Sequence, residues 1–276
     1  MRLFLIAMLL LAACQPEPDD ADAMRQQHDG ETPTPTAATD GAATADVSSE
    51  RVTYATVGGE PVEGVLVRPA RAETVLPGVV VIHEWWGLNE NVEAMARRLA
   101  AEGYAALAVD LYGGETADAP DGAQALMREA MGDEAAAVDN LRQAHAFLAD
   151  SLGAPRVGSL GWCFGGMWSL RAALALPQQL DAAVIYYGRP VIDAGRLVAL
   201  EMPVLAFFGE ADDSIPMDTV TAFDEALDRA GVEHTVRTYA GAGHAFANPS
   251  GERYEPEAAE DAWARTLAFL DEHLTP

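Results

Sequence analysis

The chain has 276 residues, half of them hydrophobic, and is therefore long enough to bury at least one sizeable core. It carries 43 acidic residues against 17 basic ones, a formal net charge of −26, and every basic residue is an arginine. Because binding to phosphate groups needs a basic face, this charge excludes nucleic acid as an expected partner.

The first residues have the pattern of an export signal. One arginine precedes an apolar run from Leu3 to Ala13, which is too short to cross a bilayer as a helix. The run ends in LAAC, which resembles the bacterial lipoprotein signal and predicts that residues 1–13 are removed and Cys14 is lipidated. We therefore expect an exported protein, anchored by lipid to the bacterial cell envelope and facing the periplasm. An ordinary cleavable signal peptide is the alternative.

Residues 14–50 are expected to form a disordered acidic tether. They are rich in Pro, Asp, Thr and Ala and show no apolar periodicity, so they would bury too little surface to offset their ordering entropy. With Cys14 lipidated, Cys163 is the only thiol of the mature chain. One folded domain is predicted over residues 51–276, beginning near Arg51.

From Arg51 onward, strand-like and helix-like patterns alternate. A hairpin is predicted across Gly58 and Gly59, and Asn89 is expected to cap a helix that stops at Gly103. The strand-like runs are residues 78–84, 104–110, 156–162, 182–188, 203–209 and 234–240. The helical runs are residues 89–104, 121–150, 164–176, 217–230 and 257–273. This alternation predicts an α/β fold with a mostly parallel central sheet and helices on both faces.

Several predicted strands end in residues that can do chemistry. These residues are His83, Glu84, Asp110, Cys163 and Asp212. Reactive groups of a parallel sheet gather at the carboxyl ends of its strands. We therefore expect these side chains to lie along one edge of the sheet.

Cys163 occupies the centre of the segment GWCFGG, which has the form of a nucleophile held on a tight strand-to-helix turn. Flanking glycines relieve crowding at such a turn, and the start of the following helix favours a thiolate and an oxyanion. The alternative is a cysteine buried as a small hydrophobic residue, since free cysteines are often buried.

A carboxylate and a histidine follow the cysteine along the chain. Asp212 and Asp213 come directly after a buried strand, and His244 lies in a glycine-rich loop after the last strand. By itself the acidic pair is also typical of a solvated turn. The order nucleophile, acid, histidine is that of α/β hydrolases, and the three signals together are more specific than any one.

Five segments resemble the dienelactone hydrolase family: HEWWGLNENV, DLYGG, GWCFGG, GEADDSIP and GAGHAF. The resemblance runs from about residue 52 to the C-terminus. It implies an α/β-hydrolase fold and the cleavage of small esters or lactones, as by carboxymethylenebutenolidase. By motif position it implies a triad of Cys163, Asp212 and His244, with Asp212 rather than Asp213 orienting the histidine.

The resemblance also implies roles for residues around the thiol. Glu84 would hold the resting thiol, the backbone N–H groups of Phe164 and Trp85 would form an oxyanion hole, and the acyl-enzyme would be a thioester. The segment HEWWG lacks the second histidine of the H-E-x-x-H zinc motif, so neither a metal nor another cofactor is expected.

The resemblance says less about the substrate. Known members of the family bind a carboxylate with arginines, one of them four residues after the triad histidine, and that position holds Asn248 here. Arg253 is a candidate replacement, and Trp86 and Tyr112 are further candidate contacts, although adjacent tryptophans are also typical of core packing. We expect a neutral small-molecule ester or lactone as substrate.

Two other functions are compatible with the same residues. Cys163 could serve a thiol redox or peroxide-sensing protein, although a second, resolving cysteine is lacking. The fold could also be a non-catalytic binding domain, against which the complete set of Glu84, Cys163, Asp212 and His244 argues. The sequence indicates neither the natural substrate nor the oligomeric state.

Overall fold

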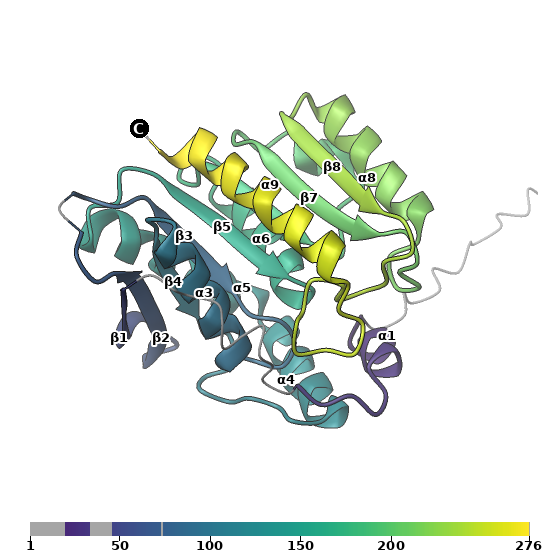
Figure 1. Cartoon of the computed structure of the whole chain (residues 1–276), viewed down its shortest axis with the longest axis horizontal. Helices are drawn as coiled ribbons and strands as arrows, with labels where there is room; N and C mark the ends of the chain where they lie inside the picture. Colours follow the sequence, from purple (N-terminus) through teal and green to yellow (C-terminus); the bar gives the residue numbers. More distant parts are fainter. Residues whose placement is uncertain (1–19, 34–45, 73, 276) are drawn as a thin grey trace, which may run out of the picture.

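The computed structural model describes residues 20–33, 46–72 and 74–275 (Figure 1). The expected signal peptide, residues 1–13, and the expected lipidation site, Cys14, lie outside the described residues. Within the described ranges, no helix is both long and apolar enough to cross a membrane.

Eight strands form one sheet in the order β1-β2-β4-β3-β5-β6-β7-β8 (Figure 1). They are β1 (Val47–Val57), β2 (Glu60–Pro69), β3 (Gly78–Ile82), β4 (Ala105–Val109), β5 (Val157–Trp162), β6 (Ala182–Tyr186), β7 (Val204–Gly209) and β8 (His234–Tyr239). β2 pairs antiparallel with both β1 and β4, and the other neighbours pair in parallel. The mostly parallel sheet that the sequence predicts is confirmed.

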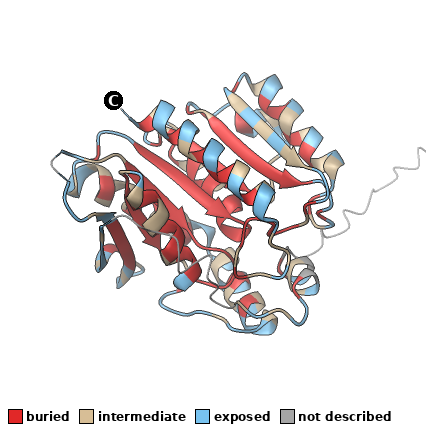
Figure 2. Ribbon diagram, viewed as in Figure 1, coloured by how far each residue is buried: buried red, intermediate tan, exposed pale blue. Residues whose placement is uncertain are grey.

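Helices cover both faces of the sheet. They are α1 (Asp20–Gln27), α3 (Glu90–Ala101), α4 (Pro120–Gly132), α5 (Glu134–Ala146), the π-helical turn η1 (Phe147–Ser151), α6 (Phe164–Ala175), α7 (Ala194–Leu197), α8 (Met217–Ala230) and α9 (Pro256–Leu274). In Figure 1, α3 and α9 lie in front of the sheet and α5 and α6 lie behind it. Figure 2 shows that buried residues concentrate in the central strands and on the helix faces turned toward them.

Local sequence explains where these elements begin and end. Every residue of β3, β4, β5, β6 and β7 is buried, as expected for apolar runs covered on both faces. The turn between β1 and β2 uses Gly58 and Gly59, both with positive φ. The Asn89 side chain accepts a hydrogen bond from the Val92 N–H at 3.3 Å and caps α3, which ends just before Gly103.

The expectation of disorder throughout residues 14–50 differs from the structure. Residues 20–33, here called the N-terminal arm, include α1, which packs beside α4 (Figure 1), and β1 begins at Val47 rather than near Arg51. The exposed ion pairs Arg25–Asp121 and Asp22–Arg128 join the two helices at 2.6 and 2.5 Å. So short a helix is marginal on its own, and contacts with the rest of the chain stabilise it.

Candidate active site

Cys163 lies at the sharp turn between β5 and α6. Its φ of 55° and ψ of −116° place a non-glycine residue in a strained region, which is found at functional sites. A β-carbon at Gly161 would overlap the carbonyl of Gly165, and one at Gly165 would overlap the carbonyl of Ile82. Only glycines therefore allow the turn to pack this closely, and the turn holds Cys163 at the carboxyl edge of the sheet.

The thiol of Cys163 is enclosed, with only 3% of the residue exposed. Burial and, next, the nearby carboxylate of Glu84 raise the pKa of the Cys163 thiol far above its ordinary value. The backbone N–H groups of Phe164 and Trp85 point at the sulfur and favour the thiolate, but their effect is smaller. The resting group is therefore a thiol, and two N–H donors surround its sulfur.

His244 and Asp212 form a buried hydrogen-bonded pair. His244 Nδ1 lies 2.8 Å from Asp212 Oδ2, and Asp212 Oδ1 accepts the backbone N–H groups of Ser214 and Ile215 at 2.8 and 3.1 Å. Burial opposes ionisation of Asp212, but His244 and these N–H donors outweigh it and hold the carboxyl pKa below its ordinary value. The neighbouring Asp213 is exposed, and Asp212 is the one of the two acids that is bonded to His244.

Glu84 is a buried carboxyl group close to the thiol. Burial raises its pKa to about 7, despite the opposing positive charge of Arg253. The Tyr187 hydroxyl donates to Glu84 Oε1 at 3.5 Å, and Asn248 Nδ2 donates a short hydrogen bond to Oε2. Asn248 Oδ1 in turn accepts hydrogen bonds from Asn91 Nδ2 and from Ser250. Asn248, expected as a substrate contact, thus holds Glu84 in place.

We expect Glu84→Gln to raise the stability of the folded protein at high pH and to leave it unchanged at low pH. The folded-state pKa of about 7 lies above the ordinary 4.5, so the unfolded chain ionises first as the pH rises. The wild-type free energy of unfolding therefore falls from pH 4.5 to 7 and remains lowered above that. Between low and high pH, this ionisation lowers the wild-type free energy of unfolding by about 3 kcal/mol.

Urea unfolding across this pH range measures the difference between Glu84→Gln and the wild type. Glu272→Gln, the same substitution at an exposed position of α9, is the matched control. The prediction would be contradicted if the free energies of unfolding of Glu84→Gln and the wild type differed by the same amount at every pH.

The N-terminal arm covers the thiol. Met24 Sδ lies 3.5 Å from Cys163 Sγ, and His28, only 3% exposed, packs its ring against Trp85, Trp86 and His244 at centroid distances of 4.7, 5.8 and 6.0 Å. Burial lowers the pKa of His28 to about 4, so its imidazole is neutral near pH 7. The arm thus adds two side chains to the centre of the site.

Arg253 contacts the arm. Its guanidinium lies 2.7 Å from His28 Nδ1 and 3.1 Å from Glu31 Oε1. The Glu31 carboxylate is 2.8 Å from the same His28 nitrogen. Arg253, which the sequence suggests as a carboxylate-binding residue, thus already has a carboxylate partner within the chain.

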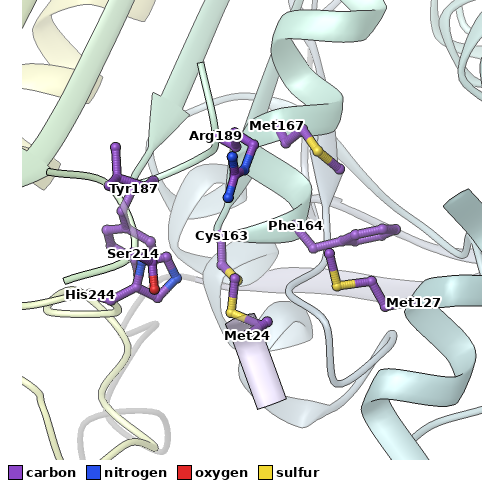
Figure 3. Close-up of a pocket in the computed structure, with 10 residues that line it drawn as sticks. Met24, Met127, Cys163, Phe164, Met167, Tyr187, Arg189, Ser214 and His244 are labelled. Carbon is purple, nitrogen blue, oxygen red and sulfur yellow. The ribbon is translucent and has the colours of Figure 1, made fainter. Parts of the chain in front are cut away.

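The space beside Cys163 is small (Figure 3). Its volume is about 30 Å³, and it is lined by Met24, Met127, Cys163, Phe164, Met167, Tyr187, Arg189, Ser214, Ile215 and His244. Typical ligand pockets hold several hundred Å³. The sulfur of Met24 lies directly against that of Cys163 (Figure 3), so an ester cannot reach the thiol while the arm is in this position.

Sequence reasoning did not single out most of these lining residues. Arg189 lies three residues after the end of β6, and the rule that reactive groups gather at strand ends could have identified it. Met24 lies in a segment without periodicity, and no sequence signal marks it. The expected contacts Trp86, Tyr112 and Arg253 do not line the cavity.

Two of the residues at strand ends have structural roles. His83 Nε2 accepts the Leu111 N–H at 3.1 Å, and Asp110 accepts the N–H groups of Tyr112, at 2.8 Å, and of Gly114. Both side chains fix the loop after β4. Of the other strand-end residues, Glu84 lies close to the Cys163 thiol and Asp212 is bonded to His244.

The sequence pattern of the dienelactone hydrolase family matches residues 62–274. The chain is 37% identical over 206 residues to Protein usf of Aquifex pyrophilus, and the match covers 72% of this chain and 89% of that protein. It is 31% identical over 223 residues to an Aquifex aeolicus protein provisionally named carboxymethylenebutenolidase, with coverage of 78% and 95%.

Among solved structures, the fold is similar to that of a protein from Klebsiella pneumoniae subsp. pneumoniae, provisionally named a dienelactone hydrolase. The TM-score is 0.74 at 32% identity, and the match covers 82% of this chain and 99% of that one. The α/β-hydrolase fold that the sequence predicts is confirmed by this likeness.

Proposed function

The chain belongs to the dienelactone hydrolase family and is a hydrolase of esters or lactones, and we propose that it uses Cys163 as its nucleophile. The observation that carries this proposal is the glycine-lined turn, which holds the Cys163 Sγ within 4.8 Å of a His244 ring nitrogen. Two backbone N–H groups also point at that sulfur, where an oxyanion would form.

The proposed reaction begins with a thiol, so it needs a base. His244 Nε2 takes the thiol proton, and Asp212 orients the ring and stabilises the imidazolium. The thiolate attacks the ester carbonyl, and the N–H groups of Phe164 and Trp85 stabilise the oxyanion. His244 returns the proton to the leaving alcohol and leaves a thioester on Cys163. Water, activated by the same histidine, then hydrolyses this thioester.

Glu84 controls the resting state in this proposal. Its negative charge disfavours a thiolate nearby, and with a pKa of about 7 it is partly ionised at neutral pH. Asn248 and Tyr187 fix its position. The thiol therefore stays protonated until a bound substrate changes the surroundings of this carboxyl group.

We propose that the substrate is neutral and that a carboxylate-bearing analogue reacts more slowly. Asn248 stands where the resemblance places an arginine, and Arg253 is held by Glu31. A charge-assisted hydrogen bond is worth about 1.5–3 kcal/mol, or about ten- to a hundredfold in affinity. The net charge of −26 also repels anions.

A panel of short esters and lactones, each compared with its free-carboxylate analogue by kcat/KM, tests both the activity and the preference. Repeated turnover is expected, which a stoichiometric thiol sensor would not show. A clear preference for the free acid would contradict the neutral-substrate proposal. Arg253→Ala and Arg189→Ala would then show which arginine binds the anion, since Arg189 lines the cavity.

We also propose that the chain is exported and anchored by lipid on Cys14. This rests on the run of residues 3–13 and the LAAC segment, which lie outside the described residues. Metabolic labelling with a fatty acid, with Cys14→Ser as the comparison, tests it; label that persists in this variant would contradict it.

A further inference from the structure

Four side chains with metal-binding atoms meet where the N-terminal arm covers Cys163. A ring nitrogen of His28, a ring nitrogen of His244 and the Cys163 Sγ all lie within 4.8 Å of one another. The thioether sulfur of Met24 lies 3.5 Å from that Sγ. Figure 3 shows Met24, Cys163 and His244 turned toward one common point. The cluster is thus one thiol, one thioether and two imidazoles.

Both histidines of this cluster have a carboxylate on their Nδ1 side. Glu31 Oε2 lies 2.8 Å from His28 Nδ1, and Asp212 Oδ2 lies 2.8 Å from His244 Nδ1. A histidine that binds a metal almost always donates its other N–H to such a group, which fixes the tautomer and turns the Nε2 lone pair toward the ion. The Asp212–His244 pair therefore has the arrangement of a metal ligand with its outer partner, and His28 Nδ1 faces both the Glu31 carboxylate and the Arg253 guanidinium.

An independent observation concerns His244 Nε2. The residue is 1% exposed, and its Nε2 has no hydrogen-bond partner among the described residues. A buried polar atom without a partner is costly and needs an explanation. In hydrolysis, Nε2 has a partner only while it takes or returns the thiol proton. A bound cation would be its partner in the resting protein, with the arm closed.

We propose that Met24, His28, Cys163 and His244 form a binding site for a soft metal ion, Cu(I). Thiolate and thioether ligands select Cu(I), and two imidazoles with one thiolate and one thioether are a known copper set. The Arg253 guanidinium lies 2.7 Å from His28 Nδ1 and 3.3 Å from His28 Nε2, and the carboxylates of Glu31 and Asp212 lie beside the same histidines. The choice of Cu(I) therefore rests on the two sulfur ligands.

Binding is a replacement of a proton by a metal ion. Cu(I) forms a bond to the Cys163 sulfur, the S–H bond breaks, and the proton passes to solvent, so no electron is transferred. In a tetrahedral site with bonds of about 2.0–2.3 Å, ligand atoms lie about 3.3–3.8 Å apart. The spacing of up to 4.8 Å therefore requires the ligands to close in by about 1 Å. Met24 and His28 belong to the arm, which can supply this adjustment.

The ion would hold the arm over the thiol. Two ligands belong to the arm and two to the domain beneath it, so the metal bridges them. With Cys163 and His244 as nucleophile and base, which rests on the function proposed above, the bound ion also blocks hydrolysis. Metal binding itself needs no substrate and can be measured apart from that function.

Anaerobic titration of the full chain with Cu(I), in competition with a chromogenic Cu(I) chelator, tests the site. We expect one Cu(I) per chain and a rise in melting temperature. His28→Gln and Met24→Leu are expected to weaken binding by more than about tenfold, as is Glu31→Gln through His28. Matched controls are His145→Gln, a histidine bonded to the Gln179 carbonyl, and Met127→Leu, another methionine of the cavity.

Several results would overturn the proposal. Unchanged affinity in both His28→Gln and Met24→Leu would mean that Cys163 and His244 bind the ion without the arm. Tighter binding of Zn(II) than of Cu(I) would refute the assignment of a soft monovalent ion. If the chain binds Cu(I) but the metal-free chain does not hydrolyse esters, the metal site is supported and the hydrolytic mechanism is refuted. Circular dichroism spectra establish that each variant is folded.

Discussion

Cys163→Ala is expected to abolish ester hydrolysis and to leave the fold intact. Loss of a triad nucleophile costs several orders of magnitude in turnover, because the remaining groups have no acyl acceptor to activate. Alanine fits the space of the thiol and takes the same φ of 55° as readily as cysteine, so a small change in stability is expected. Hydrolysis of a chromogenic acyl ester and thermal unfolding measure the two effects.

Met167→Leu is the matched control for this substitution. Met167 lines the same cavity as Cys163, so the control reports what a change of packing alone does to the rate. A slowly hydrolysed ester should also leave its acyl mass on the wild-type chain and not on Cys163→Ala. Retention of more than about a hundredth of the activity in Cys163→Ala would show that another group is the nucleophile.

Asp212→Asn is expected to reduce turnover by about three to four orders of magnitude, while Asp213→Asn changes little. The amide at position 212 keeps an oxygen for the N–H groups of Ser214 and Ile215, so the loop should survive. It removes the charge that fixes the Nδ1–H tautomer of His244 and stabilises the imidazolium. Asp213 is exposed and is the matched control one residue away.

Steady-state kinetics of the two variants with one neutral ester give the comparison. The loss is expected mainly in kcat, since neither carboxylate lines the cavity beside the thiol. Equal losses in both variants would point to a damaged loop rather than to a lost partner of His244. A larger loss at Asp213 would reverse the assignment of the acid.

Most of the domain could be predicted because its signals are local. Continuous apolar runs predict strands buried on both faces, and five fully buried strands form the centre of the sheet. The positions of Glu84, Cys163 and Asp212 follow from the rule that strand ends of a parallel sheet meet at one edge. The glycines of GWCFGG predict the tight turn because only glycine tolerates such close backbone contact.

The arm could not be predicted because nothing in its local sequence requires it to fold. Its composition is that of a disordered segment, and the residues that contact the site, Met24, His28 and Glu31, show no period. Their contacts are with residues far away in the chain: Met24 contacts Cys163, and Glu31 contacts Arg253. Likewise, Asn248 can be placed near the site from its motif, but its bond to Glu84 depends on three-dimensional packing.

The arm also sets a limit on how the rate can depend on the substrate. The cavity beside Cys163 holds about 30 Å³ when Met24 covers the sulfur, so each catalytic cycle must include an opening of the arm. For esters with good leaving groups, acyl transfer is fast, and the slower of arm opening and thioester hydrolysis then determines kcat whatever the leaving group. For poor leaving groups the chemical step is slower and determines kcat. A plot of log kcat against leaving-group pKa should therefore bend, and a flat limb whose height stays the same when the acyl group is changed reports the opening of the arm.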